Sequence, residues 1–134
     1  MELTVTEIHP AESPKLLNTE WFILKNGGEK TFHTKNCTLS VAKPGQKKRR
    51  DIGTMDPGVQ LSPGERVRVI TGNPGRKAHG KAPEDDVQNY HLFLGSQVLQ
   101  GSGCQVTLSL RSLVLVQAKF EKSAKNGVAA AADS

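Results

Sequence analysis

The pattern of short apolar segments between turn residues is the feature that most restricts the fold of this chain. No stretch keeps apolar residues at the i, i+3, i+4, i+7 spacing of an amphipathic helix. Instead, roughly eight apolar or alternating segments are separated by turn residues at intervals of about eight to twelve residues, as in β-sandwiches. Thirteen Gly and seven Pro are spread through turn-like dipeptides. The sequence therefore predicts an all-β fold, with a β-sandwich as the architecture.

Two segments define the predicted sheets best. Residues 18–28 hold the only tryptophan, Trp21, within a run of four apolar residues, and Asn26-Gly27-Gly28 follows with residues that accept a positive φ. Residues 61–65 (Leu-Ser-Pro-Gly-Glu) form a Pro-Gly turn before the strictly alternating residues 66–72. We predict that the two segments belong to one sheet system.

The remaining alternation predicts further strands, a core and a tail. Strands are expected at residues 3–8, 36–43, near Ile52, and at 90–94, 97–99, 105–110 and 113–120, with a long exposed loop at 72–89. The candidate core residues are Trp21, Phe22, Leu24, Val67, Val69, Leu92, Leu94, Val106, Leu108, Leu113 and Leu115. The expected domain spans residues 1–120, and residues 121–134 are expected to form a flexible, disordered C-terminal tail because they offer no apolar face.

The two cysteines, Cys37 and Cys104, share their strand faces with apolar residues, so both thiols are expected to point inward. They behave either as small buried hydrophobic groups or as a cross-sheet disulfide, which would require an oxidising compartment. Whether they pair is left open.

Length, charge and hydropathy limit the class of protein. A chain of 134 residues fits one domain that folds without metal or disulfide support. The net charge of +5 permits an acidic partner without requiring one. No signal peptide or membrane-length apolar run is visible, so we expect an intracellular protein, nuclear or cytoplasmic, with no membrane insertion. The oligomeric state is open.

Two blocks resemble the lamin tail domain family. Residues 18–26 resemble the family's strand in which an acidic residue precedes an apolar run that ends in a basic or polar residue and Asn. Residues 61–65 resemble its Leu-x-Pro-Gly-Glu turn, and residues 3–10 and 104–120 match its opening and closing strands. The resemblance implies an immunoglobulin-like β-sandwich that acts as a binding or assembly module within larger proteins, with no chemistry of its own.

No enzyme signature is found, and no cofactor or metal is expected. Residues 75–82 nearly match a phosphate-binding loop, but Ala82 stands where a Ser or Thr would hold magnesium. A metal site built from His79, Asp85, Asp86 and His91 lacks specific ligand spacing. A solvated acidic loop is the simpler interpretation.

Basic residues are the strongest functional signal. The candidate residues for polyanion or partner binding are Lys47, Lys48, Arg49, Arg50, Arg66, Arg68, Arg76 and Lys77. Solvated loop charge or a nuclear-import-like run at 47–50 would explain the first cluster equally well. Aromatic residues make up 4% of the chain, and none lies within the cluster, so base stacking is not supported. We predict a non-catalytic interaction or assembly module for a protein partner, with an open strand edge as a binding element; the alternative is a nucleic-acid-binding domain that uses the basic surface.

Overall fold

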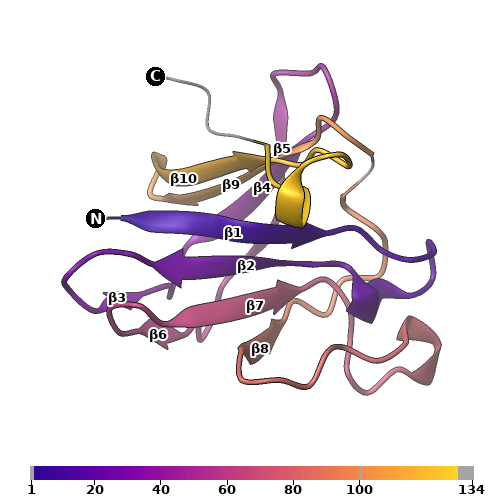
Figure 1. Cartoon of the computed structure of the whole chain (residues 1–134), viewed down its shortest axis with the longest axis horizontal. Coiled ribbons are helices and arrows are strands. Elements are labelled where there is room, and N and C mark those ends of the chain that lie inside the picture. The colour runs from indigo at the N-terminus through magenta and orange to yellow at the C-terminus, as the bar shows by residue number, and fades with distance from the viewer. Residues whose placement is uncertain (1, 100, 130–134) are drawn as a thin grey trace.

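The computed structural model describes residues 2–99 and 101–129, and it confirms the predicted all-β class (Figure 1). Within these ranges there are ten strands: β1 (Leu3–His9), β2 (Trp21–Asn26), β3 (Phe32–His33), β4 (Thr38–Ala42), β5 (Arg49–Thr54), β6 (Gln60–Leu61), β7 (Arg66–Ile70), β8 (Gln88–His91), β9 (Gln105–Leu110) and β10 (Leu113–Lys119). The same described residues contain three short 3-10 turns: η1 (Leu17–Thr19), η2 (Lys77–His79) and η3 (Lys125–Gly127). In the described part of the chain, no helix has the length and apolar character needed to span a bilayer.

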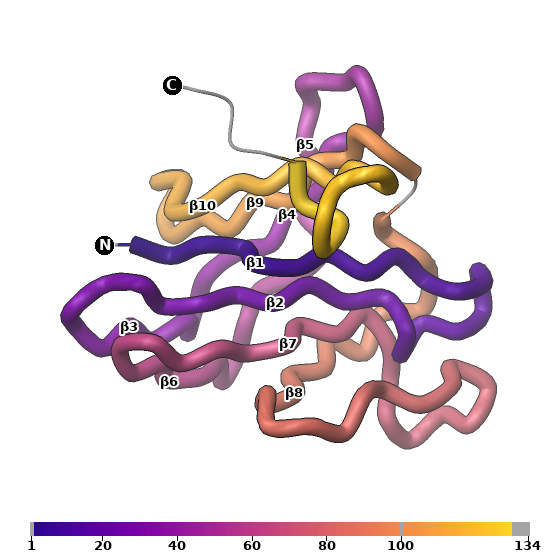
Figure 2. The backbone as a smooth tube through the Cα atoms, viewed as in Figure 1, coloured from indigo at the N-terminus to yellow at the C-terminus, as the bar shows by residue number. Residues whose placement is uncertain are grey.

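Two four-stranded sheets pack face to face. The first has the strand order β1-β2-β7-β8 and the second β10-β9-β4-β5, while β3 and β6 form a separate two-stranded sheet. Neighbouring strands are antiparallel except β7 and β8, which are parallel. The β4–β5 hairpin extends beyond the body of the sandwich, as the tube in Figure 2 shows. Strand β5 is the last strand in the order of the second sheet, so it forms one edge of that sheet.

The core fills the space between the two sheets. Phe22 and Leu24 of β2 and Val106 and Leu108 of β9 are all buried in it, as the alternation predicted. Val67 and Val69 join them, whereas Leu92, Leu94 and Leu115 are only partly buried against this cluster. Leu113 was expected inside, but it is 67% exposed at the start of β10. The predicted inward orientation of Cys37 and Cys104 is confirmed, the two form no disulfide, and burial raises the pKa of the Cys37 thiol.

A second apolar cluster lies on the outer face of the first sheet. Trp21 and Ile23 of β2 pack there with Ile70 and Val87, so Trp21 is buried outside the main core. Val87 belongs to the segment between β7 and β8, which was predicted to be an exposed loop. Because this segment covers the sheet, β2 is buried on both faces, which explains its unbroken apolar run.

The segment after β8 departs from the predicted strands. Strand β8 ends at His91, and Phe93 has a left-handed backbone with φ of 58°. Residues 97–99, expected as a strand, are not in one; Val98 and Leu99 are buried, and their backbone N–H groups donate to the Glu20 carboxylate at 2.9 and 3.0 Å. A side chain thus supplies the hydrogen bonds that a neighbouring strand would provide.

Residues 121–129, which the sequence predicts to be part of a flexible tail, contact the sandwich. Phe120 forms a bridge with Val128, and the Ala129 N–H donates to the Lys119 carbonyl at 3.0 Å. The turn η3 packs against β1. Residues 130–134 of the predicted tail lie outside the described residues. Contacts with the strands of the sandwich therefore continue past residue 120.

Replacing Gly127 with alanine is expected to detach this C-terminal segment. Gly127 has φ of 74°, and an added Cβ would meet the backbone oxygen of Ile8 on β1. We expect the Ala129 amide to exchange its hydrogen at least about tenfold faster, an effect of ~1.4 kcal/mol, while β2 amides stay protected. Gly95→Ala is the control, because a Cβ there meets nothing within 4 Å. Unchanged exchange at Ala129 in the Gly127 variant would contradict the packing described for η3.

Candidate functional site

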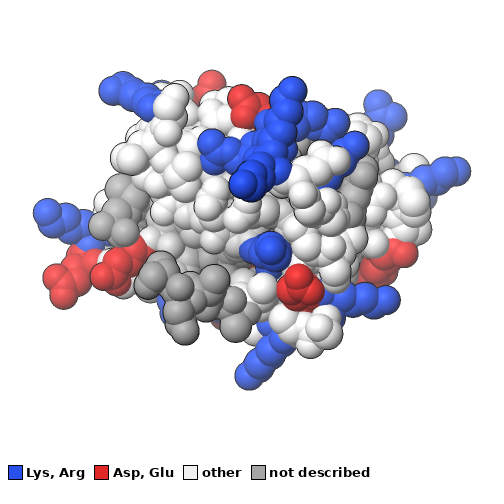
Figure 3. Space-filling model, turned by 90° about the horizontal axis from the view of Figure 1, so that it is seen from above, with Lys and Arg blue, Asp and Glu red and all other residues white. Residues whose placement is uncertain are grey.

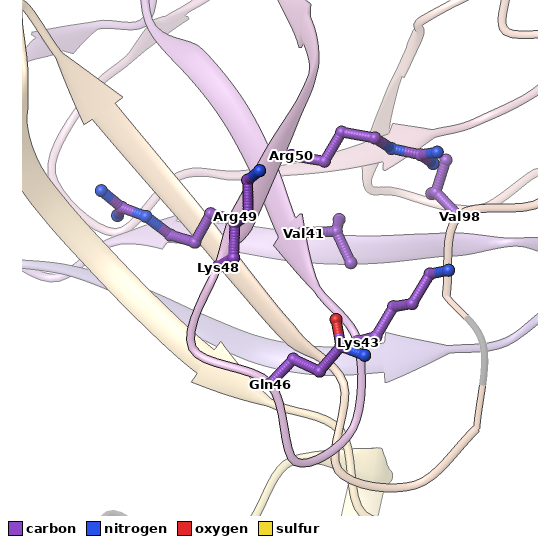
Figure 4. A pocket seen from close by; sticks show the side chains of 7 residues that line it. All are labelled: Val41, Lys43, Gln46, Lys48, Arg49, Arg50 and Val98. Atoms are coloured by element: carbon purple, nitrogen blue, oxygen red, sulfur yellow. The ribbon is translucent and has the colours of Figure 1, made fainter.

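A basic hollow lies where the β4–β5 hairpin meets the segment after β8. It has a volume of about 310 Å³. Seven residues line it, and we call this set the basic hollow: Val41, Lys43, Gln46, Lys48, Arg49, Arg50 and Val98 (Figure 4). In this view Lys43 and Arg50 extend toward Val98, whereas Arg49 extends in the opposite direction. The hollow thus has an aliphatic floor and a basic rim.

The hairpin positions this rim through its register. Pro44 and Gly45 form the turn after β4, where the Gln46 N–H donates to the Lys43 carbonyl at 3.0 Å and Gly45 has φ of 75°. Arg50 is paired directly with Val41 on β4. Paired residues of antiparallel strands point to the same face, so Arg50 stands on the face that Val41 turns toward the core. Lys47 belongs to the same turn but does not line the hollow.

The cations of the rim lack carboxylate partners within the described chain. The three ion pairs found there involve Arg66, Arg68 and Lys81, and none involves a residue of the hollow. Asp51, the acidic residue next to Arg50, instead accepts a hydrogen bond from the Ser40 hydroxyl at 2.7 Å. Lys and Arg gather visibly when the molecule is seen from the side of the β4–β5 hairpin (Figure 3). Unpaired positive charge at a concave site attracts anions.

Arg68 does not belong to the exposed basic surface that the sequence predicted. Its side chain is 3% exposed, it forms an ion pair with Asp85 at 2.7 Å, and its guanidinium lies 4.6 Å from the centre of the Trp21 ring. Hydrogen bonds from the Arg68 guanidinium, and then from the Val87 N–H, lower the pKa of Asp85 to about 2. Arg68 therefore fastens the segment before β8 onto the first sheet, and the predicted basic stripe on β7 is corrected at this position.

The other predicted basic residues lie away from the hollow. Arg66 is 3.6 Å from Asp86, and Arg76 and Lys77 are exposed in the segment between β7 and β8. None of the three lines the basic hollow. The structure thus brings Lys48, Arg49 and Arg50 together with Lys43 and separates them from Arg66, Arg68, Arg76 and Lys77.

The sequence prediction of the site included neither Val98 nor Glu20. Val98 was assigned to a strand, yet it forms part of the floor of the hollow. Glu20, which is fully buried, holds Val98 and Leu99 in place and also accepts a hydrogen bond from the Thr71 hydroxyl at 2.6 Å. Burial raises the pKa of this carboxyl, against the effect of its hydrogen bonds. A lone acidic residue beside an apolar run is the only sequence signal for this role.

The acidic loop offers no clustered metal ligands. Among the described residues, no group of three or more His, Cys, Asp or Glu side chains is placed to hold a metal ion. Asp85 is engaged by Arg68, and His79 accepts a hydrogen bond from the Asn73 N–H at 3.0 Å. The imagined set of His79, Asp85, Asp86 and His91 is therefore not assembled.

Comparison with known proteins adds no family. Neither a family model nor a curated protein matches this sequence. The resemblance to lamin tail domains stays a prediction from the residues that carry it.

Proposed function

We propose that this chain is a non-catalytic interaction module that binds an acidic segment of a protein partner at the basic hollow. One observation carries the proposal: Lys43, Lys48, Arg49 and Arg50 line a hollow with an aliphatic floor and have no carboxylate partner in the described chain. The seven lining side chains are aliphatic, basic or amide groups. Such a set binds carboxylates or phosphates through charge and supplies no nucleophile with a partnering base.

We propose further that the sandwich is immunoglobulin-like and of the lamin tail type. The two sequence blocks that carry the resemblance are neighbours in space, because β2 pairs with β7. Asn26 joins them. Its side-chain amide donates to the Leu61 carbonyl at 2.9 Å, and its backbone carbonyl accepts from the Gly64 N–H at 2.7 Å. The Glu65 carboxylate accepts from the Ser62 N–H at 2.7 Å, which lowers the pKa of Glu65. This mutual bonding gives the Leu-Ser-Pro-Gly-Glu turn a structural role that supports the resemblance.

Single-stranded nucleic acid is the second candidate partner, since the same four unpaired cations would neutralise phosphates. The floor argues for protein, because Val41 and Val98 provide no aromatic face for a base. Aliphatic surface of this kind accommodates an apolar side chain of a peptide.

Fluorescence anisotropy with two labelled probes tests the proposed function. The first probe is an acidic peptide of Asp, Glu and Ser, and the second is an oligothymidylate of matching length, each at about 50 mM and about 300 mM salt. We expect the peptide to bind more tightly than the oligonucleotide, and more weakly at the higher salt. The triple variant Lys48→Glu, Arg49→Glu, Arg50→Glu should lose at least about tenfold in affinity, because three exposed ion pairs worth ~0.2–1 kcal/mol each become repulsions.

The matched control reverses three charges elsewhere: Arg76→Glu, Lys77→Glu and Lys81→Glu. These residues are exposed and do not line the basic hollow. We expect this variant to keep most of the affinity. Equal losses in the two variants would show that net charge, and not the hollow, governs binding, and tighter binding of the oligonucleotide would favour the second candidate.

A further inference from the structure

We propose that a second hollow, beside Phe93, anchors an apolar or aromatic side chain of the same acidic segment. This hollow has a volume of about 360 Å³, and we call it the Phe93 hollow; Gly53, Thr54, Asp56, Pro57 and residues 89–93 line it. The inference rests on the proposed function, since it places a second contact on the partner that the basic hollow binds.

Phe93 is presented to solvent by a constrained backbone. Its side chain is 61% exposed, and φ of 58° is uncommon for a bulky residue. Hydrogen bonds hold both neighbours: the Leu92 N–H donates to the Ile70 carbonyl and the Leu94 N–H to the Thr71 carbonyl, each at 2.8 Å. An exposed aromatic residue kept in a costly conformation is a recurrent feature of binding sites.

The two hollows border the same strand. Arg49 and Arg50 at the start of β5 line the basic hollow, and Gly53 and Thr54 at its end line the Phe93 hollow. Their walls also meet inside the molecule, where a small cavity of about 10 Å³ is lined by Val98 of the first hollow and Leu92 of the second. A ligand that follows β5 therefore reaches both.

Strand geometry sets the spacing of the two contacts. Four residues of an extended chain cover ~13 Å at about 3.3 Å per residue, and an extended ligand beside β5 has the same rise per residue as the strand. When the acidic residues of the ligand lie at the basic hollow, the ligand side chain about four positions away therefore lies at the Phe93 hollow. An aromatic or large aliphatic side chain fits there, because it can pack against the exposed Phe93 ring.

Side-chain contacts, and not regular strand addition, account for this mode of binding. The register between β4 and β5 shifts at Leu39 and Ser40, which leaves an extra residue on β5. A bulge and basic side chains on an edge strand oppose regular pairing with another strand. The contacts that remain are the charged rim, the aliphatic floor and the Phe93 ring.

Peptides that differ only in the position of one phenylalanine test the inference. The set comprises the acidic Asp/Glu/Ser peptide, the same peptide with Phe four residues before or after its acidic run, and one with Phe next to the run. We expect one of the two peptides with Phe four residues from the acidic run to bind about tenfold more tightly than the acidic peptide, an effect of ~1.4 kcal/mol. The peptide with Phe next to the run should gain less affinity.

The variant Phe93→Asn should abolish that gain and leave the acidic peptide's own affinity unchanged. Asn tolerates the left-handed backbone, so the loop keeps its conformation. Leu113→Asn is the control, because Leu113 is 67% exposed on β10, which lies at the other edge of the second sheet from β5.

The first of three outcomes separates this inference from the proposed function, and the other two overturn both. A Phe-bearing peptide that binds no better than the acidic peptide, or whose gain survives Phe93→Asn, overturns the second anchor and leaves the basic hollow standing. Failure of every peptide to bind overturns both. Binding of oligothymidylate that depends on Phe93 and on the rim cations, without peptide binding, assigns the two hollows to nucleic acid and likewise overturns both.

Discussion

Replacing Trp21 with alanine is expected to lower the free energy of unfolding by about 3–5 kcal/mol, measured by urea denaturation followed by circular dichroism. The side chain is 6% exposed on the outer face of the first sheet. Its ring stacks on His9 with centroids 5.0 Å apart and lies under the Arg68 guanidinium at 4.6 Å. The substitution removes a large buried surface and leaves Arg68, a nearly buried cation, without its aromatic neighbour.

Two controls identify the cause of this loss. Trp21→Phe keeps an aromatic ring between His9 and Arg68, so we expect less than half of the destabilisation. Leu113→Ala removes a side chain that is 67% exposed, and its effect should stay within about 0.5 kcal/mol. A loss below about 1 kcal/mol for Trp21→Ala would mean that the segment between β7 and β8 does not cover this face of the sheet.

The same face shows where the sequence pattern is not enough. The apolar run from Trp21 to Leu24 correctly predicts a strand, because alternation and turn signals are local. It does not show that Trp21 and Ile23 meet a second cluster, since every residue of the run is apolar whichever face it occupies. The segment that covers these two residues is held by the contact between Arg68 and Asp85. No local sequence pattern connects Arg68 with Asp85.

Strand β10 shows a second reason why the sequence pattern does not predict which residues are buried. Counting alternate residues from Leu113 places Leu113 and Leu115 inside, but the buried residues of this region are Ala118 and Phe120. The register shifts between Val114 and Val116, and such a bulge changes which residues face the core. Alternation alone gives no sign of where a bulge falls.

Only part of the basic hollow could be predicted from the sequence. Lys48, Arg49 and Arg50 are adjacent, so their cluster needed no structure, and the hairpin that presents them follows from the Pro-Gly turn after β4. Val98 reaches the hollow only through the folded chain. Its position depends on Glu20, which acts across the sandwich by accepting hydrogen bonds from backbone N–H groups.

Replacing Glu20 with glutamine is expected to lower the free energy of unfolding by about 1–3 kcal/mol. Glutamine keeps the volume but has one acceptor oxygen in place of two. The Val98 and Leu99 N–H groups and the Thr71 hydroxyl all donate to the carboxylate, so at least one buried donor loses its partner. Urea denaturation at pH 7 measures the loss, and Glu29→Gln, at an exposed residue, should change stability by less than about 0.5 kcal/mol.

The effect of pH on this variant has a definite sign. Burial raises the pKa of Glu20 above its ordinary value of 4.5, so the folded protein binds this proton more tightly than the unfolded chain does. The stability gained from that proton is complete below pH 4.5 and is lost as the pH rises through the raised pKa. The free energy of unfolding of the wild-type protein, relative to that of Glu20→Gln, should therefore increase as the pH falls from 7 toward 4.5. A constant difference over this range would contradict the raised pKa.

Glu20 also couples stability to the basic hollow, although it does not line it. Val98, which Glu20 holds through its N–H group, forms the floor with Val41. In Glu20→Gln the segment at Val98 and Leu99 loses part of its anchor, so the floor is less well fixed before the ligand arrives and binding must supply the ordering. We expect the acidic peptide to bind severalfold more weakly to Glu20→Gln at pH 7, with an unchanged salt dependence because the rim cations are intact. An equal affinity for both proteins would show that the hollow forms independently of this carboxylate.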